Sequence, residues 1–574
     1  MRRFLPLAAL LSLSVFACAL ETDEDLDDSS EDSALTEGTA ETRAVLRLVN
    51  DATVTKDELV TKAKVQAAIA GRIVAHRNGA DALAGTADDD AYDTLAELKG
   101  QSVGASTLKK LVDYAKARGF MSTAEVVFSP QAYDQSHLAK VQTLIAGAKE
   151  SIDIAMYSFS DAGISTALEA AAARGVKIRF MFETGGDDSR KPVLTIQNTK
   201  SWQLEKRGAD VRFVNKIMHH KFMIVDGPRD AMDHANGARI VTGSANWSSG
   251  AATRYDENTL FLSGEPELAL RLQREFNTLW EHSRDFVSTR TFEYAPSTLS
   301  IVDPLTPDNT GIDAFFTSSN FTPSGTTFRA NGKDTVADAL VRAIEGATKS
   351  IHLASGHLRS RPVAEALEKK RIAAPTVDIR VYLDSQEYIS QSGHNAQVSD
   401  RADCITAAAG NQSAIDDCNE KGFLFGYEAG QAGVNVKYKY YAYRWDTSYA
   451  PQMHNKFMVV DAKTLYTGSY NLSDNAEHET FENMLSFSGA SFAPLVASYE
   501  QTFEKLWRTG EAEGKLAALE AKLAGTGPVP IVFDAMALDW AQITALKTKI
   551  RVACPAVDSD AYRTNAAGHL TCAR

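Results

Sequence analysis

The chain has few cysteines, a shortage of positive charge and no long apolar run beyond its first twenty residues. Five cysteines in 574 residues exclude a small disulfide-stapled scaffold, and no Cys or acid cluster lies at metal-ligand spacing. Lys and Arg total 60 against 74 Asp and Glu, a net charge of −14, which excludes a generally basic nucleic-acid binder but not local basic patches. No later segment approaches the roughly 18 apolar residues of a membrane-spanning helix.

Residues 1–19 have the layout of a secretory signal. Arg2 and Arg3 form a short basic start, Leu5 to Phe16 is an apolar run, and small residues close the segment at Ala19. The apolar run is too short to span a bilayer. We therefore expect an exported protein, secreted or periplasmic, with cleavage after Ala19.

The end of that segment allows a second interpretation. Val15 to Cys18 resembles a bacterial lipoprotein box, in which Cys18 would carry the lipid anchor. Lipidation of Cys18 would leave an even number of cysteines. These form two close pairs that are expected to be disulfides in an oxidising compartment, namely Cys404 with Cys418 and Cys554 with Cys572.

Residues 20–43 are expected to be a disordered acidic linker, because positions 21–42 carry ten acids and no Lys or Arg. Such a segment cannot bury a core. The following residues, 44–122, are expected to form a small all-helical domain, since apolar residues recur there at helix spacing. Turn residues between positions 78 and 90 indicate a loop inside it.

Part of this helical domain resembles the helix-hairpin-helix module, which holds the DNA backbone through turn amides. The pattern is Leu95-x-x-Leu98, then Val103-Gly104, then Leu108-x-x-Leu111. The resemblance implies DNA contact by residues 44–120. A protein-contact or spacer role fits the same pattern.

The order strand, helix, strand occurs twice after residue 122, which predicts α/β halves with mixed or largely parallel sheets. Half 1 is expected at 123–290 and half 2 at 312–510, separated by a Pro/Thr/Asn-rich stretch, and 511–574 is a C-terminal extension without an assigned function. The predicted strand, helix and strand are 151–157, 164–174 and 176–183 in half 1, and 349–353, 362–370 and 377–384 in half 2.

One nine-residue phrase occurs twice, 235 residues apart, as Met218–Asp226 and Met453–Asp461. Each copy is followed by Gly-Ser-x-Asn, and a glutamate comes eleven residues after that asparagine. The repeated polar residues are His219, Lys221, Asp226, Ser244, Asn246 and Glu257 in the first set, and His454, Lys456, Asp461, Ser469, Asn471 and Glu482 in the second. Two coincident sets indicate a duplicated half-site with chemistry between the halves.

The residue types in each set suit a phosphate group. Strand alternation places His219 and Lys221 on one face, where the lysine supplies compact positive charge for a non-bridging oxygen. Serine and asparagine add neutral donors, and each glutamate can orient its histidine through the other ring nitrogen. A zinc site is disfavoured, because His219 and His220 point to opposite faces and the second copy has Asn455 in place of His220.

The doubled pattern resembles the phospholipase D superfamily of phosphodiesterases, over roughly residues 124–510. The resemblance implies two pseudo-twofold-related halves around one site that needs no metal and no cofactor. It also implies a nucleophilic histidine that forms a phosphohistidine and an acid histidine that protonates the leaving alcohol and then activates water. By the same resemblance His219 is the nucleophile and His454 is the acid. Asp226 and Asp461 are counted with Lys221, Lys456 and the two glutamates among the catalytic residues, although in the family these aspartates are mostly structural.

The motif determines the reaction type and leaves the substrate open. We expect a monomeric phospholipase D that acts on phospholipid headgroups at a membrane surface, which export and the lack of an overall basic surface favour. The alternative is a secreted, metal-independent endonuclease that cuts DNA or RNA. The helix-hairpin-helix-like module favours it, as do the interleaved aromatics and cations of 437–445 with Tyr449, which could stack bases or lie at a membrane interface. A half-buried strand fits that stretch as well.

Overall fold

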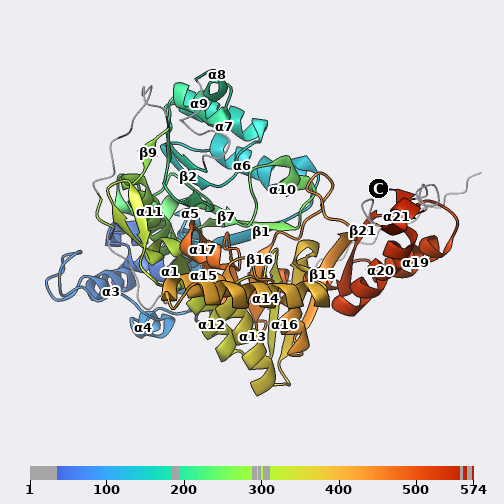
Figure 1. Cartoon of the computed structure of the whole chain (residues 1–574). Helices are drawn as coiled ribbons and strands as arrows, with labels where there is room; N and C mark the ends of the chain where they lie inside the picture. Colours follow the sequence, from blue (N-terminus) through green and yellow to red (C-terminus); the bar gives the residue numbers. More distant parts are fainter. Residues whose placement is uncertain are drawn as a thin grey trace, which may run out of the picture. The chain divides into compact units, whose positions relative to one another are not determined.

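The computed structural model describes residues 35–183, 193–286, 294, 299–301, 311–555, 560–564 and 572–573 (Figure 1). The predicted secretory signal, the lipoprotein box and most of the acidic linker lie outside the described residues. The chain divides into the units Met1–Leu35 and Thr36–Arg574, and the elements below belong to the second. None of the helices in the described part is both long and apolar enough to cross a bilayer.

Five helices precede the first strand: α1 (Ala40–Asn50), α2 (Lys56–Thr61), α3 (Ala67–Arg77), α4 (Leu95–Gly100) and α5 (Ala105–Ala117). Helix α1 begins four residues before the expected start of this domain, because the Thr39 side chain accepts the N–H of Thr42 and caps the helix. The predicted linker therefore ends before Ala40. Arg47 of α1 contacts Glu265 at 2.8 Å and Glu267 at 3.1 Å, which docks the helical region onto half 1.

Half 1 is an eight-stranded mixed sheet in the order β1-β8-β7-β6-β2-β3-β4-β9. Strands β2, β3 and β4 are parallel and the other pairs are antiparallel. The strands are β1 (Thr123–Ser129), β2 (Ser151–Met156), β3 (Lys177–Phe182), β4 (Ala209–Phe213), β6 (Lys221–Val225), β7 (Arg239–Gly243), β8 (Glu257–Ser263) and β9 (Arg284–Asp285). Helices α6 (His137–Ala146) and α7 (Ala162–Ala173) add buried side chains to one core, and α11 (Pro266–Glu281) adds them to another.

Half 2 repeats this sheet strand for strand, in the order β10-β19-β17-β16-β13-β14-β15-β21. Its strands are β10 (Ile312–Phe316), β13 (Ser350–Ser355), β14 (Asp378–Asp384), β15 (Asn435–Ala442), β16 (Lys456–Val460), β17 (Thr464–Gly468), β19 (Asn483–Phe487) and β21 (Val532–Asp539). The helix between β13 and β14 is α13 (Arg361–Ala373). The predicted α/β class with two mixed-sheet halves after a helical region is confirmed.

The C-terminal extension is not separate from half 2, contrary to the boundary drawn at residue 510. Its strand β21 pairs antiparallel with β15 and completes the sheet. Ile543, Leu546 and Ile550 of α20 (Trp540–Ala553) are fully buried in the same core as β13 and β14. The predicted linker at 296–311 lies largely outside the described residues.

A shared apolar core joins the two halves. It contains Phe222 and Phe276 from half 1 and Phe457, Tyr499 and Phe503 from half 2, all fully buried. The last two residues come from α18 (Ala493–Trp507), the counterpart of α11. Because burial of each such side chain contributes about 1.5–3 kcal/mol, this core fixes the two motif strands relative to each other.

Both expected disulfides are present, Cys404–Cys418 and Cys554–Cys572. The first joins α14 (Gln391–Ala407) to α15 (Gln412–Glu420). No residue of α14 is buried, so this disulfide constrains a hairpin of helices that has little core of its own.

Replacement of Cys404 and Cys418 by serine is expected to loosen the α14–α15 hairpin locally. A loop of this length is worth about 3 kcal/mol in the chain-entropy model, and almost all of that belongs to the hairpin. Limited proteolysis between residues 391 and 421 should become faster, while the global Tm changes by less than about 2 °C. The matched control, Cys554→Ser with Cys572→Ser, should lower the global Tm because Cys554 is buried in the half 2 core. The reverse pattern would contradict this assignment.

Candidate active site

The two motif histidines each contact a buried glutamate. His219 Nδ1 lies 2.7 Å from Glu482 Oε1, and His454 Nδ1 lies 2.7 Å from Glu257 Oε1. Each glutamate thus comes from the opposite half. The expectation that a glutamate orients the histidine of its own set is wrong.

Short strand pairings between the halves explain this exchange. Strand β5 (Ile217–Met218) runs parallel to β18 (Thr480–Phe481), and the His219 N–H donates to Phe481 O at 3.1 Å. The second set repeats the arrangement, because Met453 bridges to Asp256 and the His454 N–H donates to Asp256 O at 3.0 Å. The glutamate is the next residue in each pairing, so it is delivered to the histidine of the other half.

The two lysines lie beside their histidines, as strand alternation predicts. Lys221 Nζ is 3.2 Å from His219 Nε2, and Lys456 Nζ is 3.3 Å from His454 Nδ1. Each ammonium also donates to the backbone carbonyl of its histidine at 2.8 Å. Both lysines are buried, so two amino groups are held close to the imidazoles.

The serines support the glutamate strands. The Ser244 hydroxyl donates to Glu257 Oε2 at 2.7 Å and accepts the Asn258 N–H at 2.9 Å, and Ser469 Oγ accepts the Asn483 N–H at 3.0 Å. Both serines are fully buried. The geometry therefore places them to position the glutamates, where phosphate contact had been expected.

Asn246 and Asn471 remain available for a ligand. Each side chain is partly exposed. The side-chain carbonyl oxygen of each is buried and accepts no hydrogen bond from the described part of the chain. In this matched pair only the amide N–H groups can donate to the phosphoryl oxygens of a substrate between the halves, whereas the carbonyl oxygens need a separate donor.

Asp226 and Asp461 lie outside the histidine cluster. Each follows the far end of its motif strand, five residues and about 17 Å beyond the lysine. The Asp226 carboxylate accepts the N–H groups of Glu150 at 2.8 Å and Ser151 at 3.2 Å, which fixes the start of β2. Asp461 accepts the equivalent groups before β13. The inclusion of these two residues among the catalytic groups is not supported, and the structure gives them a role in the turn.

Asp461 is expected to stabilise the fold in a pH-dependent manner. Burial alone would raise the pKa of this carboxyl, but the Thr348 hydroxyl and the N–H groups of Ser350 and Lys349 lower it to about 2. A carboxyl whose pKa falls on folding stabilises the protein above its unfolded pKa of about 3.9, and the contribution is lost as the pH falls towards 2. The Tm of Asp461→Asn should therefore lie below that of the wild type at pH 7, with the gap closing between about pH 4 and pH 2.

The control for this experiment is Asp534→Asn. Its carboxyl is 85% exposed and lies 3.8 Å from Lys515, so its replacement should leave the Tm nearly unchanged at every pH. Thermal unfolding followed by circular dichroism measures both variants. A gap for Asp461→Asn that stays constant down to pH 2 would contradict the role of its carboxylate.

The buried charges of the site change one another's proton affinity. Burial, and then the two ammonium groups, lower the pKa of His219 and of His454 well below the usual range. Burial raises the pKa of both paired glutamates to about 7 and lowers the pKa of Lys221 to about 7 and of Lys456 to about 8. In each pair the glutamate therefore holds a proton more readily than it does in water and the histidine less readily, so the two groups compete for one proton.

Several residues around the histidines were not predicted from the sequence. The Tyr157 ring lies 4.6 Å from the His219 ring, whereas the equivalent position in half 2 is Gly356. Glu183 accepts the Met218 N–H at 2.9 Å, and Asp384 accepts the Met453 N–H at 2.8 Å. An acid at the end of the second predicted strand of each half was a repeated signal that would have revealed the last two.

The aromatic and basic stretch before the second motif is mostly a core strand. Tyr438, Tyr440 and Tyr441 of β15 are buried, and Lys439 pairs with buried Asp256 at 2.8 Å. Trp445, in the loop beyond the strand, is 42% exposed. The half-buried strand is therefore the correct interpretation, and these tyrosines offer no surface for bases or lipid.

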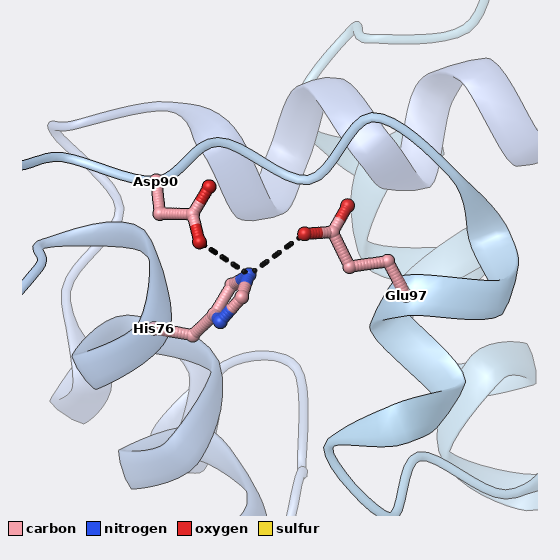
Figure 2. Close-up of side chains that lie close together, drawn as sticks. All are labelled: His76, Asp90 and Glu97. Atoms are coloured by element: carbon pink, nitrogen blue, oxygen red, sulfur yellow. Dashed lines mark hydrogen bonds and ion pairs between the residues drawn. The ribbon is translucent and has the colours of Figure 1, made fainter.

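Two clusters with possible metal-ligand composition occur in the described part of the chain, and neither contains a motif residue that carries the predicted chemistry. In the first, His76 Nε2 lies 3.1 Å from Glu97 Oε1 and 3.7 Å from Asp90 Oδ2, and both contacts meet at the same ring nitrogen (Figure 2). A single ring N–H can donate to one carboxylate, so a hydrogen bond to Glu97 accounts for the shorter contact. It ties the end of α3 to α4 across the loop.

The helices expected for the helix-hairpin-helix-like pattern are α4 and α5, and DNA contact there stays a prediction.

Comparison with known proteins identifies the family. The family model described as "Cardiolipin synthase, PLD-like domain" matches residues 141–280 and 340–507. A mitochondrial cardiolipin hydrolase of Danio rerio is 30% identical over 152 residues, 26% of this chain and 59% of the relative. A phospholipase D of Rickettsia felis is 30% identical over 179 residues, 31% of this chain and 79% of the relative.

The chain thus spans little more than half the length of the cardiolipin hydrolases that it matches. Among solved structures, the phosphatidylserine synthase of Haemophilus influenzae aligns with a TM-score of 0.42 and 12% identity, over 66% of this chain and 86% of that protein. The family model covers both motif-bearing halves and more than half of the chain. The chain belongs to the phospholipase D-like family.

Proposed function

We propose that the protein is an exported phosphodiesterase that hydrolyses phospholipid headgroups at a membrane surface. The observation that carries this proposal is the pair of histidine–glutamate contacts, each made across the halves and each beside a buried lysine. The relatives named cardiolipin hydrolase and phospholipase D support a phospholipid substrate. Both half-sites belong to one chain, so the site requires no second copy and a monomer suffices.

In the first proposed step, neutral His219 attacks phosphorus through Nε2. Glu482 on Nδ1 fixes the tautomer that leaves Nε2 free, and burial keeps the imidazole unprotonated. The bond to the leaving alcohol breaks as the nitrogen–phosphorus bond forms. His454 gives its Nε2 proton to that alcohol while the proton held by Glu257 moves to His454 Nδ1, so the His454–Glu257 pair as a whole loses one proton. Lys221 and Lys456 balance the negative charge of the phosphoryl oxygens.

In the second step, water replaces the alcohol on the His454 side. His454, now neutral, takes a proton from this water as its oxygen attacks phosphorus, and the bond to His219 breaks. The products are a phosphomonoester and the original protonation state of both histidines. Division of the displacement into two steps is the benefit of covalent catalysis.

The test offers the purified mature protein two substrates in EDTA: phospholipid vesicles containing phosphatidylcholine and cardiolipin, and supercoiled plasmid DNA. We expect headgroup release and no nicking, at a rate that EDTA does not change, and no release by His454→Ala. Nicking without lipid hydrolysis would assign the alternative, a secreted metal-independent endonuclease. Loss of activity in EDTA with recovery on zinc addition would contradict the mechanism.

A further inference from the structure

The two half-sites differ at the residue between histidine and lysine, which is His220 in the first motif and Asn455 in the second. Both side chains are buried, and strand alternation directs both away from the motif histidines, towards the shared core. The two positions are equivalent, since the backbone carbonyls of His220 and Asn455 accept the N–H groups of Tyr157 at 3.0 Å and Gly356 at 3.2 Å.

His220 lies between two acceptors. Its Nε2 is 3.0 Å from Glu275 Oε1 on α11, and its Nδ1 is 3.4 Å from Asn483 Oδ1 on β19. The Asn483 amide nitrogen donates to Thr242 Oγ1 at 3.1 Å, which turns its carbonyl oxygen towards the imidazole. Ser318 donates to the other oxygen of Glu275 at 2.5 Å. An imidazole donates from both nitrogens only when it is protonated, so this pocket suits an imidazolium.

Asn455 lies in a neutral network. Its side-chain carbonyl accepts the Asn258 amide N–H at 2.9 Å, and the Asn258 carbonyl accepts the hydroxyls of Thr467 at 3.0 Å and Tyr499 at 2.9 Å. Asn258 and Asn483 hold equivalent positions, directly after the two glutamates. Asn258 turns its amide N–H towards Asn455, whereas Asn483 turns its carbonyl oxygen towards His220.

The difference places an imidazole behind the His219–Glu482 pair, at the position where the His454–Glu257 pair has an amide. Asn483, which contacts His220, is bonded in the chain to Glu482, the partner of His219. The charged groups that face this pair are Lys221, Lys456, His454 and His220, and Glu275 faces His220 from α11. The two lysines act on both pairs. The His454–Glu257 pair has His357 and His137 near it, but His357 is 21% exposed and contacts Glu387 at 2.9 Å, and burial lowers the pKa of His137. Solvent therefore screens His357 more than fully buried His220, which acts on the His219–Glu482 pair. A nearby cation favours the deprotonated state.

We propose that His220, held between Asn483 and Glu275, is a positioning residue that keeps the His219–Glu482 pair poorer in protons than the His454–Glu257 pair. This inference rests on the proposed function, because it explains which of two similar histidines is the neutral nucleophile and which is the protonated acid. Agreeing with it, His220 is among the charges that lower the pKa of His219 and that of Glu482.

The test measures histidine titration in the full chain by NMR with 13C-labelled imidazole, which needs no substrate. In the wild type, His219 is expected to protonate at a lower pH than His454. In His220→Asn, which installs the residue that half 2 contains, the His219 midpoint should move up towards that of His454. Glu275→Gln removes the anion that favours the protonated form of His220, and it should also move the His219 midpoint up. Both variants are first checked for a wild-type circular dichroism spectrum.

The matched control is His352→Asn, which also removes a buried histidine that contacts two acids, Glu500 and Asp378. It is expected to lower the Tm without a change in the order of the two midpoints. The inference is overturned if His219 and His454 titrate together in the wild type, or if neither His220→Asn nor Glu275→Gln moves the His219 midpoint.

A kinetic readout separates this inference from the proposed function. With bis(p-nitrophenyl) phosphate, His220→Asn should shift the acid limb of kcat/KM to higher pH, because more of His219 is protonated at a given pH. Activity at pH 6 should fall about tenfold, the lower range for loss of a supporting contact, and recover to within about twofold at pH 8. Unequal titration without any turnover would reject the proposed function and leave the inference standing. An unchanged acid limb in an active variant would reject the inference.

Discussion

His219→Ala is expected to abolish phosphodiester turnover, with kcat/KM lower by at least about 10⁴-fold, the scale seen when a covalent nucleophile is removed. No other imidazole occupies its position, since His220 points to the opposite face and contacts Glu275. The effect of His454→Ala on turnover should depend on the leaving group of the substrate. Hydrolysis of a lipid headgroup needs protonation of a poor leaving group and should fall to a similar extent.

A p-nitrophenyl diester distinguishes the two variants, because p-nitrophenolate leaves without a proton. His454→Ala should then release about one equivalent of p-nitrophenol in a burst and stall at the covalent intermediate, whereas His219→Ala should give no burst. The control is His234→Ala, which removes a partly exposed histidine paired with Glu150 at 3.3 Å and should behave as wild type. A burst from His219→Ala would contradict its assignment as nucleophile.

Glu482→Gln is expected to slow formation of the covalent intermediate by about a hundredfold or more, the upper range for loss of a supporting carboxylate. Gln keeps a hydrogen-bonding group at the His219 Nδ1 but removes the carboxylate that holds the tautomer and stabilises the developing positive charge. Glu257→Gln makes the same change at His454. It should therefore slow breakdown of the intermediate, for which His454 is the base.

Stopped-flow measurement of the p-nitrophenol burst and of the later steady state separates formation from breakdown. If each glutamate served the histidine of its own half, the effects would be reversed: Glu257→Gln would slow the burst and Glu482→Gln the steady state. That result would contradict the exchanged contacts. Circular dichroism of both variants excludes loss of the fold as the cause of either effect.

The sequence was sufficient to predict the local chemistry of each half-site, but not which glutamate contacts which histidine. Alternation correctly places each lysine on the strand face of its histidine, because period-2 geometry is a property of the chain alone. The partner of His219 is decided by the contact between β5 and β18, which lie more than 260 residues apart. Such long-range pairing depends on how the two halves pack, and no spacing records it.

Two other differences between prediction and structure have separate origins. The tyrosines of β15 have the composition of a binding surface, but β21 covers the edge of that strand and α20 packs nearby. The extension that supplies both elements has no repeat in its sequence to connect it with half 2. Asp226 and Asp461 recur with the catalytic residues because the motif is one strand with chemistry at one end and a turn at the other. In both copies the aspartate has a positive φ, 51° and 55°.

The most direct measurement is the identity of the residue that carries phosphorus during turnover. His454→Ala is mixed with bis(p-nitrophenyl) phosphate, quenched in alkali to preserve a nitrogen–phosphorus bond, digested and sequenced by mass spectrometry. We expect one p-nitrophenyl phosphoryl group per chain, on His219. Two results would contradict the account of one site built from two unequal halves. One is a phosphoryl group on a residue of His454→Ala other than His219. The other is a p-nitrophenol burst without any covalent adduct.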